Sequence, residues 1–426
     1  MATIEAINFK QHRAVVLDKQ VTWSAVQHTN PINSLPQLFW ADGKPWREVN
    51  LWLMEQALDR DLTLATVDAK AVSLLSYANW LEFSCVDWWH FPVRKADRCL
   101  NRYRGFLIKQ RGDGHLAPAT VTQRMRVAIQ LYRWLQTNKI ISSDWPLWTE
   151  RNIGIHVHDV FGFKRAIECV STDLMIPNRR STSDRLEDGL LPISANDRDS
   201  LLEFSRTHGS QELYLMLLLG FFSGLRIQTI SDLKIQTINN ALPEPGVSGL
   251  YKIHVGPDAT PRVATKYNVS GFVWITKSLL ERLKQYAYDT RRLKREALAD
   301  TNNKDLLFLT RFGNPYARRA SDKSPAINVE LFHLREKARN RQLSVLQNFH
   351  FHQSRCTFAT ELARLAIRVG GAIHAIAIVK EALLHRSESS SLKYIKFLEK
   401  SPIKEEAANE FTTEFLGLVS KQDENL

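Results

Sequence analysis

The sequence predicts a mainly helical protein with two domains, the second of which also contains a small antiparallel sheet. In four successive segments between residues 46 and 148, apolar residues recur every three or four positions, which is the period of an amphipathic helix. Between about 175 and 192 the chain becomes polar and carries glycine and proline, as linkers do. Short segments at 249–257, 262–276 and 305–310 are typical of strands separated by polar turns.

The clearest helix of the first domain follows Pro118. Thr120 is expected to cap it, because a threonine hydroxyl accepts hydrogen bonds from N–H groups of the first turn. Its predicted apolar face consists of Val121, Met125, Ile129, Tyr132 and Leu135. The basic residues largely off that face are Arg124, Arg126, Arg133 and Lys139. Such residues either face solvent or contact a phosphate backbone, and both interpretations stay open. In the second domain, Ser194 or Asn196 is expected to cap the first helix.

Composition indicates a polyanionic partner and a reducing compartment. Lysine and arginine outnumber aspartate and glutamate by 57 to 45, which gives a net charge of +12. The four cysteines form neither a CxxC pair nor a disulfide-like pattern, so we expect no metal site. The pair His350 and His352 lacks third and fourth ligands nearby. We expect a cytoplasmic protein without a membrane partner, because no stretch approaches 18 uncharged apolar residues.

Chemistry on a phosphodiester is indicated by the last fifth of the chain. HFHQSRCTFAT at 350–360 contains His352 and Arg355, and LLHRSESSSLKYIK at 383–396 contains His385 and Tyr394. A phenol, with a pKa of roughly 10, is a poor nucleophile unless its surroundings help it. Negative charge on a reacting phosphate calls for arginine, whose planar guanidinium donates two parallel hydrogen bonds. Arg226, which follows an apolar run and a Ser-Gly break, is a second candidate.

In order and spacing, these residues resemble the signature of the tyrosine recombinase (phage integrase) family. In that family an arginine follows an apolar helix and a glycine, as in GLR at 224–226, and an HxxR box opens a later helix, as in HQSR at 352–355. A second histidine precedes the tyrosine by nine residues, which is the separation of His385 and Tyr394. The resemblance extends over roughly residues 46–410.

The resemblance implies a division of the chain into five parts. Residues 46–150 would form a helical core-binding domain that contacts DNA, and residues 193–410 a mixed α/β, mostly helical, catalytic domain with a small antiparallel sheet. Residues 151–192 would form a linker region between them. Residues 1–45 would be an N-terminal extension of unclear role with strand character, and residues 411–426 a tail that can contact a neighbouring protomer.

The resemblance also implies a role for each candidate residue. Tyr394 would attack a scissile DNA phosphate and form a 3′-phosphotyrosyl bond. Arg226 and Arg355 would hold the non-bridging oxygens and stabilise the transition state. His352 would act in proton transfer as a base toward Tyr394, and His385 would donate a hydrogen bond to the phosphate.

A lysine in a strand turn would be the general acid toward the departing 5′-oxygen. Lys266 lies in a suitable turn, and Lys252 on the preceding strand is the competing candidate. Three positions depart from the family pattern. Cys356 follows the second arginine where histidine is frequent, Leu384 replaces a usual glycine, and Thr229 stands where an acidic residue is frequent.

The predicted function is therefore that of a site-specific DNA recombinase of the integrase or transposon type. The resemblance implies a homotetramer on double-stranded DNA, associated with the nucleoid, and accessory proteins stay open as further partners. No cofactor is expected, because cationic side chains supply the charge of a metal ion and the phosphotyrosyl bond keeps the energy for rejoining. Two alternatives are a related outcome, such as resolution or relaxation of DNA, and a catalytically silent DNA-binding or architectural protein. The sequence determines neither the DNA site nor the direction of the reaction.

Overall fold

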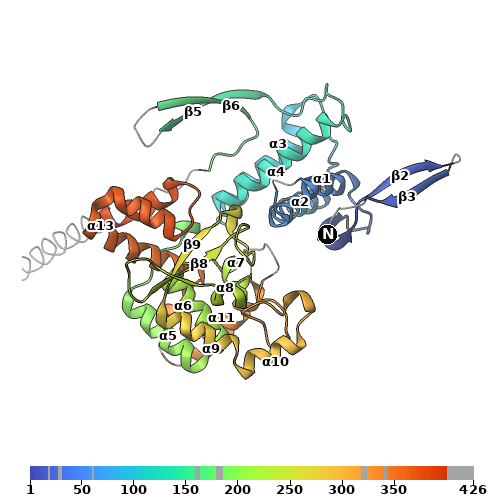
Figure 1. Ribbon diagram of the computed structural model, residues 1–426. Helices are drawn as coiled ribbons and strands as arrows, with labels where there is room; N and C mark the ends of the chain where they lie inside the picture. Colours follow the sequence, from blue (N-terminus) through green and yellow to red (C-terminus); the bar gives the residue numbers. More distant parts are fainter. Residues whose placement is uncertain are drawn as a thin grey trace, which may run out of the picture. The chain divides into compact units, whose positions relative to one another are not determined.

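The computed structural model describes residues 1–17, 20–26, 31–59, 62–158, 164–178, 186–317, 324–339, 341 and 343–400. The chain divides into two compact units, 1–182 and 183–426 (Figure 1). Among the described residues, helices predominate and every sheet is antiparallel. The predicted fold class is confirmed.

Unit 1 is a helical bundle with two-stranded ribbons attached (Figure 1). Its helices are α1 (Arg47–Leu58), α2 (Leu64–Ser84), α3 (Cys99–Gly112) and α4 (Pro118–Thr137), with a 3-10 turn η1 (Lys95–Asp97) before α3. Its ribbons pair β1 (Thr3–Phe9) with β4 (Ile32–Phe39), β2 (His12–Leu17) with β3 (Gln20–Ala25), and β5 (Glu150–His158) with β6 (Lys164–Thr172).

The first 45 residues contribute to the core of unit 1. Leu38 is fully buried, and its backbone N–H and C=O are both bonded by the Asn50 side chain, at 2.7 and 3.0 Å. Ala2 is buried in the same apolar cluster as Leu38. Strands β1 and β4 are thereby attached to helix α1, because a buried backbone amide needs a partner.

Helix α4 confirms the predicted apolar face, whose five residues are all buried. The predicted cap is wrong. The helix begins at Pro118, with Ala117 at the N-cap and no side-chain cap. The first N–H groups of a helix have no partner within the helix, so proline, which has no N–H, loses nothing at the first position, and its φ is already helical. The helix therefore starts at Pro118, two residues before Thr120.

The hairpin β5–β6 lies where the sequence predicted only linker. Its strands pair in unbroken antiparallel register from Glu150 opposite Thr172 to His158 opposite Lys164. Strands are held together by backbone hydrogen bonds, and their amino-acid composition indicates them only weakly when the side chains are of mixed polarity. For this reason the sequence did not predict strands in this segment.

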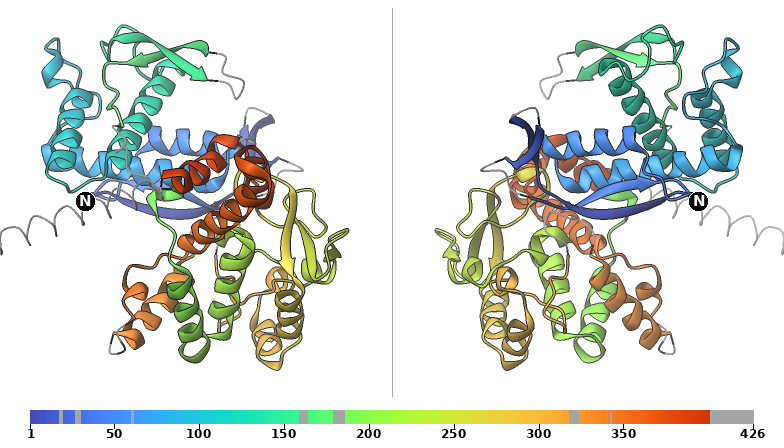
Figure 2. Two further views of the ribbon diagram at one scale, coloured as in Figure 1. Left: turned by 90° about the vertical axis from the view of Figure 1, so that its left-hand side faces the viewer. Right: turned by 90° about the vertical axis from the view of Figure 1, so that its right-hand side faces the viewer.

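Unit 2 combines a three-stranded sheet, which lies at its edge, with helices packed beside it (Figure 2). Its longer helices are α5 (Ala195–His208), α6 (Gln211–Ser223), α9 (Lys277–Ala287), α10 (Thr290–Leu298), α11 (Pro325–Ala338) and α13 (His352–Ala382). Its short helices and turns are η2 (Glu187–Gly189), α7 (Ile227–Ser231), α8 (Ile235–Asn239), η3 (Lys266–Asn268), η4 (Thr301–Asn303) and α12 (Ser344–Asn348). The strands of the sheet lie in the order β7 (Leu242–Pro243), β8 (Leu250–Val255) and β9 (Gly271–Thr276). A further helical segment covers residues 388–400.

Of three predictions for unit 2, one is confirmed, one is wrong and one concerns residues that the structure does not describe. Ser194 caps α5 by accepting from the Asp197 N–H, as predicted. The predicted strand at 305–310 is wrong. Only isolated bridges form there, at Leu306 and Leu309, because this segment pairs with loops rather than with the sheet. The sequence also predicts a tail helix near EEAANEFTTEFLGLV at 405–419, which lies outside the described residues.

The packing of α13 along α6 positions the candidate site (Figure 2). Helix α6 is apolar around nearly its whole circumference, which is typical of a helix in the interior of a domain. A Cβ atom on Gly220 of α6 would lie 2.2 Å from the Ser354 hydroxyl of α13, so only glycine permits this approach. The close contact brings the end of α6 next to the start of α13.

Helix α13 is long and apolar, and it breaks at Gly371, whose φ is 78°. An 18-residue window in it has a mean hydropathy of 1.7 and is 22% buried, so by length and composition it could cross a membrane. The sequence analysis did not expect such a window. One such helix is weak evidence for a span, because a helix of a soluble protein passes the same test.

A buried carboxylate links α6 to α9 and α10. The Glu212 side chain is fully buried and accepts hydrogen bonds from Arg291 at 2.8 and 3.0 Å and from the Tyr286 hydroxyl at 3.0 Å. Arg295, itself nearly buried, lies 3.0 Å from the second carboxylate oxygen. Such a network stabilises a fold only while all its members are present.

We predict that Glu212→Ala destabilises unit 2 by about 3–5 kcal/mol, because Arg295 then stays buried without its counterion. Thermal unfolding followed by calorimetry would measure the loss. Glu281→Ala is the matched control, since Glu281 forms an exposed pair with Lys277. Equal melting temperatures for the two variants would show that the Glu212 network contributes nothing.

Candidate active site

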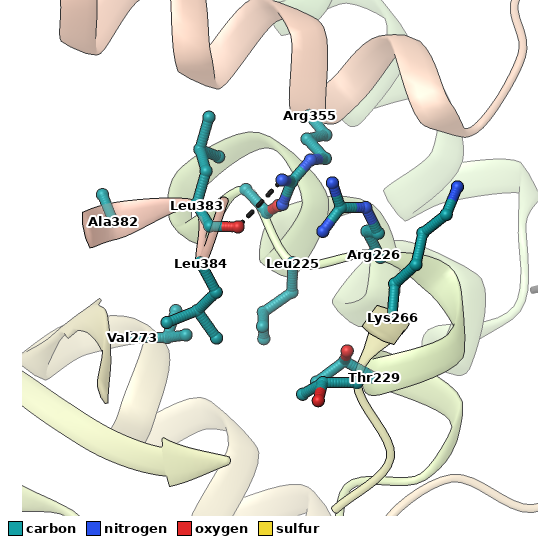
Figure 3. A pocket seen from close by; sticks show the side chains of 11 residues that line it. Leu225, Arg226, Thr229, Lys266, Val273, Arg355, Ala382, Leu383 and Leu384 are labelled. Carbon is teal, nitrogen blue, oxygen red and sulfur yellow. Dashed lines mark hydrogen bonds between the residues drawn. The ribbon is translucent and has the colours of Figure 1, made fainter. Parts of the chain in front are cut away.

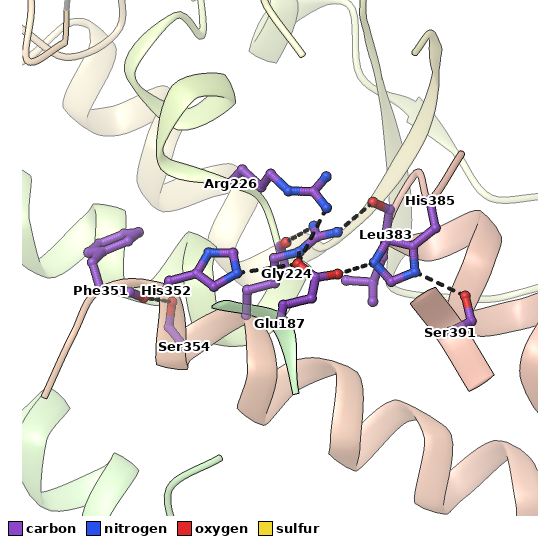
Figure 4. A network of polar contacts seen from close by, with 10 residues as sticks. Glu187, Gly224, Arg226, Phe351, His352, Ser354, Leu383, His385 and Ser391 are labelled. Carbon is purple, nitrogen blue, oxygen red and sulfur yellow. Dashed lines mark hydrogen bonds and ion pairs between the residues drawn. The ribbon is translucent and has the colours of Figure 1, made fainter. Parts of the chain in front are cut away.

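Four of the predicted residues surround one carboxylate, that of Glu187 (Figure 4). Oε2 of Glu187 lies 3.2 Å from His352 Nε2, 3.3 Å from Arg355 Nε and 3.4 Å from Arg226 Nη2. Oε1 accepts from His385 Nε2 at 2.5 Å. Side chains separated by up to 159 residues in the sequence (385 − 226) thus converge on a single anion.

Arg355 holds the site together. Its guanidinium is buried and donates to the Gly224 carbonyl at 2.6 Å, to the Leu383 carbonyl at 2.9 Å and to Glu187. Gly224 ends α6 and Leu383 ends α13, so one side chain connects the ends of two helices. Burial lowers the pKa of Arg355 to about 10, with the charge of Arg226 as the next cause, and the group stays protonated at neutral pH.

Two residues beside Arg355 adopt left-handed backbone conformations. Gly224 has a φ of 66°, and a Cβ there would lie 2.4 Å from the Phe358 ring and 2.7 Å from Leu383. Leu384 has a φ of 51°, which explains why glycine suits this position in the family that the sequence resembles. A leucine held there stores strain of roughly 1–2 kcal/mol.

The hydrogen bonds define the tautomer of each histidine. An ionised carboxylate only accepts, so Nε2 of both His352 and His385 carries the proton that is donated to Glu187. His385 Nδ1 then accepts from the Ser391 hydroxyl at 2.9 Å. Burial lowers the pKa of His385, which keeps this ring neutral at pH 7.

Glu187 is not among the site residues predicted from the sequence. Burial by itself raises the pKa of Glu187, but hydrogen bonds from His352 and His385 and the charges of Arg355 and Arg226 outweigh it and hold that pKa far below its ordinary value. Glu187 belongs to the three-residue turn η2 within the stretch predicted as linker. No spacing pattern distinguishes it from other acidic residues of a polar loop, so only the fold reveals it.

Tyr394 is completely buried in an apolar cluster with Cys356 and Leu186. Its ring stacks on His385, with 6.2 Å between centroids and an interplanar angle of 12°. Burial raises the pKa of Tyr394 well above the ordinary value, and the Glu187 charge and Cys356 raise it further while Arg355 lowers it. In this conformation Tyr394 is protonated and shielded from solvent.

Lys266 lines the same pocket as Arg226 and Arg355 (Figure 3). It begins the 3-10 turn η3, and it makes no ion pair with any residue that the structure describes. Lys252, the competing candidate, lies 3.5 Å from the Glu244 carboxylate and over the Phe272 ring. Lys266 Nζ lies over the Tyr267 ring, 5.6 Å from its centroid, and the choice between the two lysines as general acid stays a prediction.

Asp232 fixes the loop that carries Lys266. Its Oδ2 accepts the Ala264 backbone N–H at 2.6 Å, and its Oδ1 lies 2.7 Å from Lys234. Lys234 is buried, so the pair is partly shielded from water. Because Ala264 is two residues before Lys266, the Asp232 carboxylate limits where that lysine can reach.

The four basic residues predicted to contact DNA belong to unit 1. Arg126, Arg133 and Lys139 are exposed and Arg124 is half-buried on α4 and just beyond it. Arg133 packs over the Trp148 ring and lies 3.7 Å from Glu150. Their role in binding stays a prediction. Among the described residues, no group of three potential ligands could hold a metal ion.

Comparisons with known proteins give structural neighbours only. No protein-family model and no curated protein matches the chain. Among solved structures, the Tn1549 transposon integrase in complex with transposon right end DNA is 13% identical, with a TM-score of 0.47 over 84% of this chain and 98% of that one. A lambda integrase dimer bound to a COC′ core site is 11% identical, with a TM-score of 0.47 over 82% and 94%. A lambda integrase tetramer bound to a Holliday junction is 11% identical, with a TM-score of 0.45 over 82% and 76%.

We predict that Gly224→Ala disrupts the site far more than Gly246→Ala. Both residues have positive φ, but Gly246 has open space around its Cα, so alanine there costs only the backbone strain of roughly 1–2 kcal/mol. At Gly224 the new methyl group also collides with Phe358 and Leu383, which adds on the order of 1–3 kcal/mol. Urea unfolding of the two variants measures the difference, and equal stabilities would contradict the close packing at Gly224.

Proposed function

We propose that this protein is a site-specific DNA recombinase that cuts and rejoins DNA through a 3′-phosphotyrosyl intermediate. The observation that carries the proposal is the convergence of Arg226, His352, Arg355 and His385 on one anion. Four donors that meet at a single oxyanion form the kind of site that a reacting phosphate requires. The net charge of +12 suits a DNA partner.

In the proposed reaction, the Tyr394 oxygen attacks a backbone phosphorus atom and the bond to the 5′-oxygen breaks. Arg226 and Arg355 bind the non-bridging oxygens, and His385 donates to one of them through Nε2. His352 takes part in moving the tyrosine proton. Lys266 gives a proton to the departing 5′-oxygen, which leaves as a hydroxyl group. Rejoining is the reverse, with the 5′-hydroxyl as the attacking group, and it needs no further energy source.

The remaining parts of the chain receive proposed roles in binding and assembly. Unit 1 would contact DNA through the basic residues of α4, and the catalytic domain would act within a homotetramer. The tail beyond residue 410, with the apolar spacing of EFTTEFLGLV, would contact a neighbouring protomer. The competing proposal is a DNA-binding or architectural protein that performs no cleavage, and the burial of Tyr394 is the observation that favours it.

We expect the protein to form a covalent adduct with DNA that depends on Tyr394. A pool of nicked duplexes of random sequence traps the intermediate, because the strand next to the nick diffuses away and cannot be rejoined. The adduct would survive denaturing electrophoresis, and Tyr394→Phe would abolish it. Tyr288→Phe is the matched control, because the Tyr288 hydroxyl is exposed and accepts from the Asn239 side chain. Equal adduct from the wild-type protein and Tyr394→Phe would reject Tyr394 as the nucleophile.

We expect Lys266→Ala to slow cleavage by on the order of a hundredfold or more on ordinary DNA. A substrate with sulfur in place of the 5′-bridging oxygen should restore the rate, because a thiol, with a pKa of about 8.5, leaves without protonation. Lys252→Ala should change neither rate by more than a few-fold. If the sulfur substrate rescues Lys252→Ala and not Lys266→Ala, the general acid is Lys252.

A further inference from the structure

The turn that carries Glu187 covers both parts of the candidate site. The Glu187 carboxylate lies among the four cationic or donor side chains, and the neighbouring Leu186 is buried in the apolar cluster that encloses Tyr394. Within the part of the chain that the structure describes, the backbone hydrogen bonds of the turn join Leu186, Glu187, Gly189 and Leu190 to one another. Side chains therefore attach this turn to the rest of unit 2.

The segment is connected to α13 on its other side as well. The Leu191 carbonyl accepts from Gln353 at 3.1 Å, and the Ile193 N–H donates to the Thr357 hydroxyl at 3.0 Å. These contacts hold residues 191–193 along the first turns of α13, directly after the turn that carries Glu187.

A carboxylate fits this site incompletely. Nε of Arg226 is buried and has no hydrogen-bond partner among the described residues, although four other donors reach Glu187. A buried N–H without a partner is unfavourable. An anion with more oxygens, such as a phosphodiester, could accept from this donor too.

The same donors cannot serve Glu187 and a phosphate together. Nε2 of His352, Nε2 of His385 and Nε of Arg355 all point at the carboxylate. With Glu187 present, the two arginines keep a net charge of +1, and a phosphodiester beside a carboxylate would be repelled. The Glu187 charge also raises the pKa of the Tyr394 hydroxyl.

We propose that residues 186–190 form an internal latch, in which Glu187 occupies the position of the scissile phosphate and Leu186 helps to bury Tyr394 until DNA displaces them. The inference rests on the proposed function and adds its regulation. The latch offsets part of the positive charge of Arg226 and Arg355 when no DNA is present. It also keeps the nucleophile from water and from unintended phosphates.

The first test is the binding of inorganic phosphate, which needs no DNA and no cleavage. Glu187→Gln keeps the size of the side chain and removes its charge, and Glu187→Ala removes the side chain. In both variants phosphate should raise the melting temperature by several degrees, while the wild-type protein should show little shift. Glu361→Gln is the matched control, because Glu361 pairs with Arg364 of the same helix, α13, and both side chains are partly exposed. Equal phosphate shifts for wild type and both variants would overturn the latch.

The second test is the rate of adduct formation on the pool of nicked duplexes. The latch predicts that Glu187→Gln forms adduct roughly tenfold faster than wild type, or more. If Glu187→Gln instead forms adduct more slowly and gains no phosphate binding, Glu187 holds the histidines in position and the latch is wrong, while the recombinase stands. If phosphate binding is gained but no protein forms adduct, the contact of Glu187 with the anion site is supported and the recombinase is rejected.

Wild-type protein supplies a further measurement if the variants fail to fold. A three-residue turn has little stability of its own, so the backbone amides of Leu186, Gly189 and Leu190 should exchange hydrogen faster when duplexes of random sequence are bound in excess. Unchanged or slower exchange of these amides would overturn the latch.

Discussion

The buried guanidinium of Arg355 is the interaction on which the candidate site depends. A charged group in the interior must satisfy its N–H groups, and here the acceptors are two helix-end carbonyls and one carboxylate. Gly224 ends α6 and Leu383 ends α13. Because the Arg355 guanidinium needs both of their carbonyls as acceptors, its hydrogen bonds fix how the two helix ends are placed. The tight backbone conformations at Gly224 and Leu384 follow from that placement.

Two neighbouring arginines, of which Arg355 is buried and Arg226 partly exposed, create a demand for negative charge. Arg226 is among the causes that lower the pKa of Arg355, second to burial, so the pair is unfavourable without an anion. The chain supplies one in Glu187, from a segment that is far from both arginines in sequence. In this structure the anion beside the two arginines is therefore the protein's own Glu187 carboxylate. The arrangement reconciles a stable fold with a strongly cationic centre.

The same logic applies to Tyr394. Its burial stabilises the apolar cluster around α13 and, as burial does for any acid, raises the pKa of the phenol. The proposed latch would therefore require Tyr394 to leave this apolar cluster before it reacts. Leu384, next to His385, is held in a left-handed backbone conformation.

The helices of both units, the apolar face of α4 and the cap at Ser194 could be predicted from the sequence, because periodicity and capping are local properties. Order and spacing also determined which arginines and histidines to bring together, since each stands at a recognisable helix end or loop. Only the tertiary structure decided that Glu187 lies among them, that Lys266 rather than Lys252 is free of a carboxylate, and that Tyr394 is buried. The positions of Glu187 and Tyr394 depend on contacts between segments far apart in the chain, and the pair of Lys252 with Glu244 depends on how a strand and a turn are placed. Such contacts leave no periodic mark in the sequence.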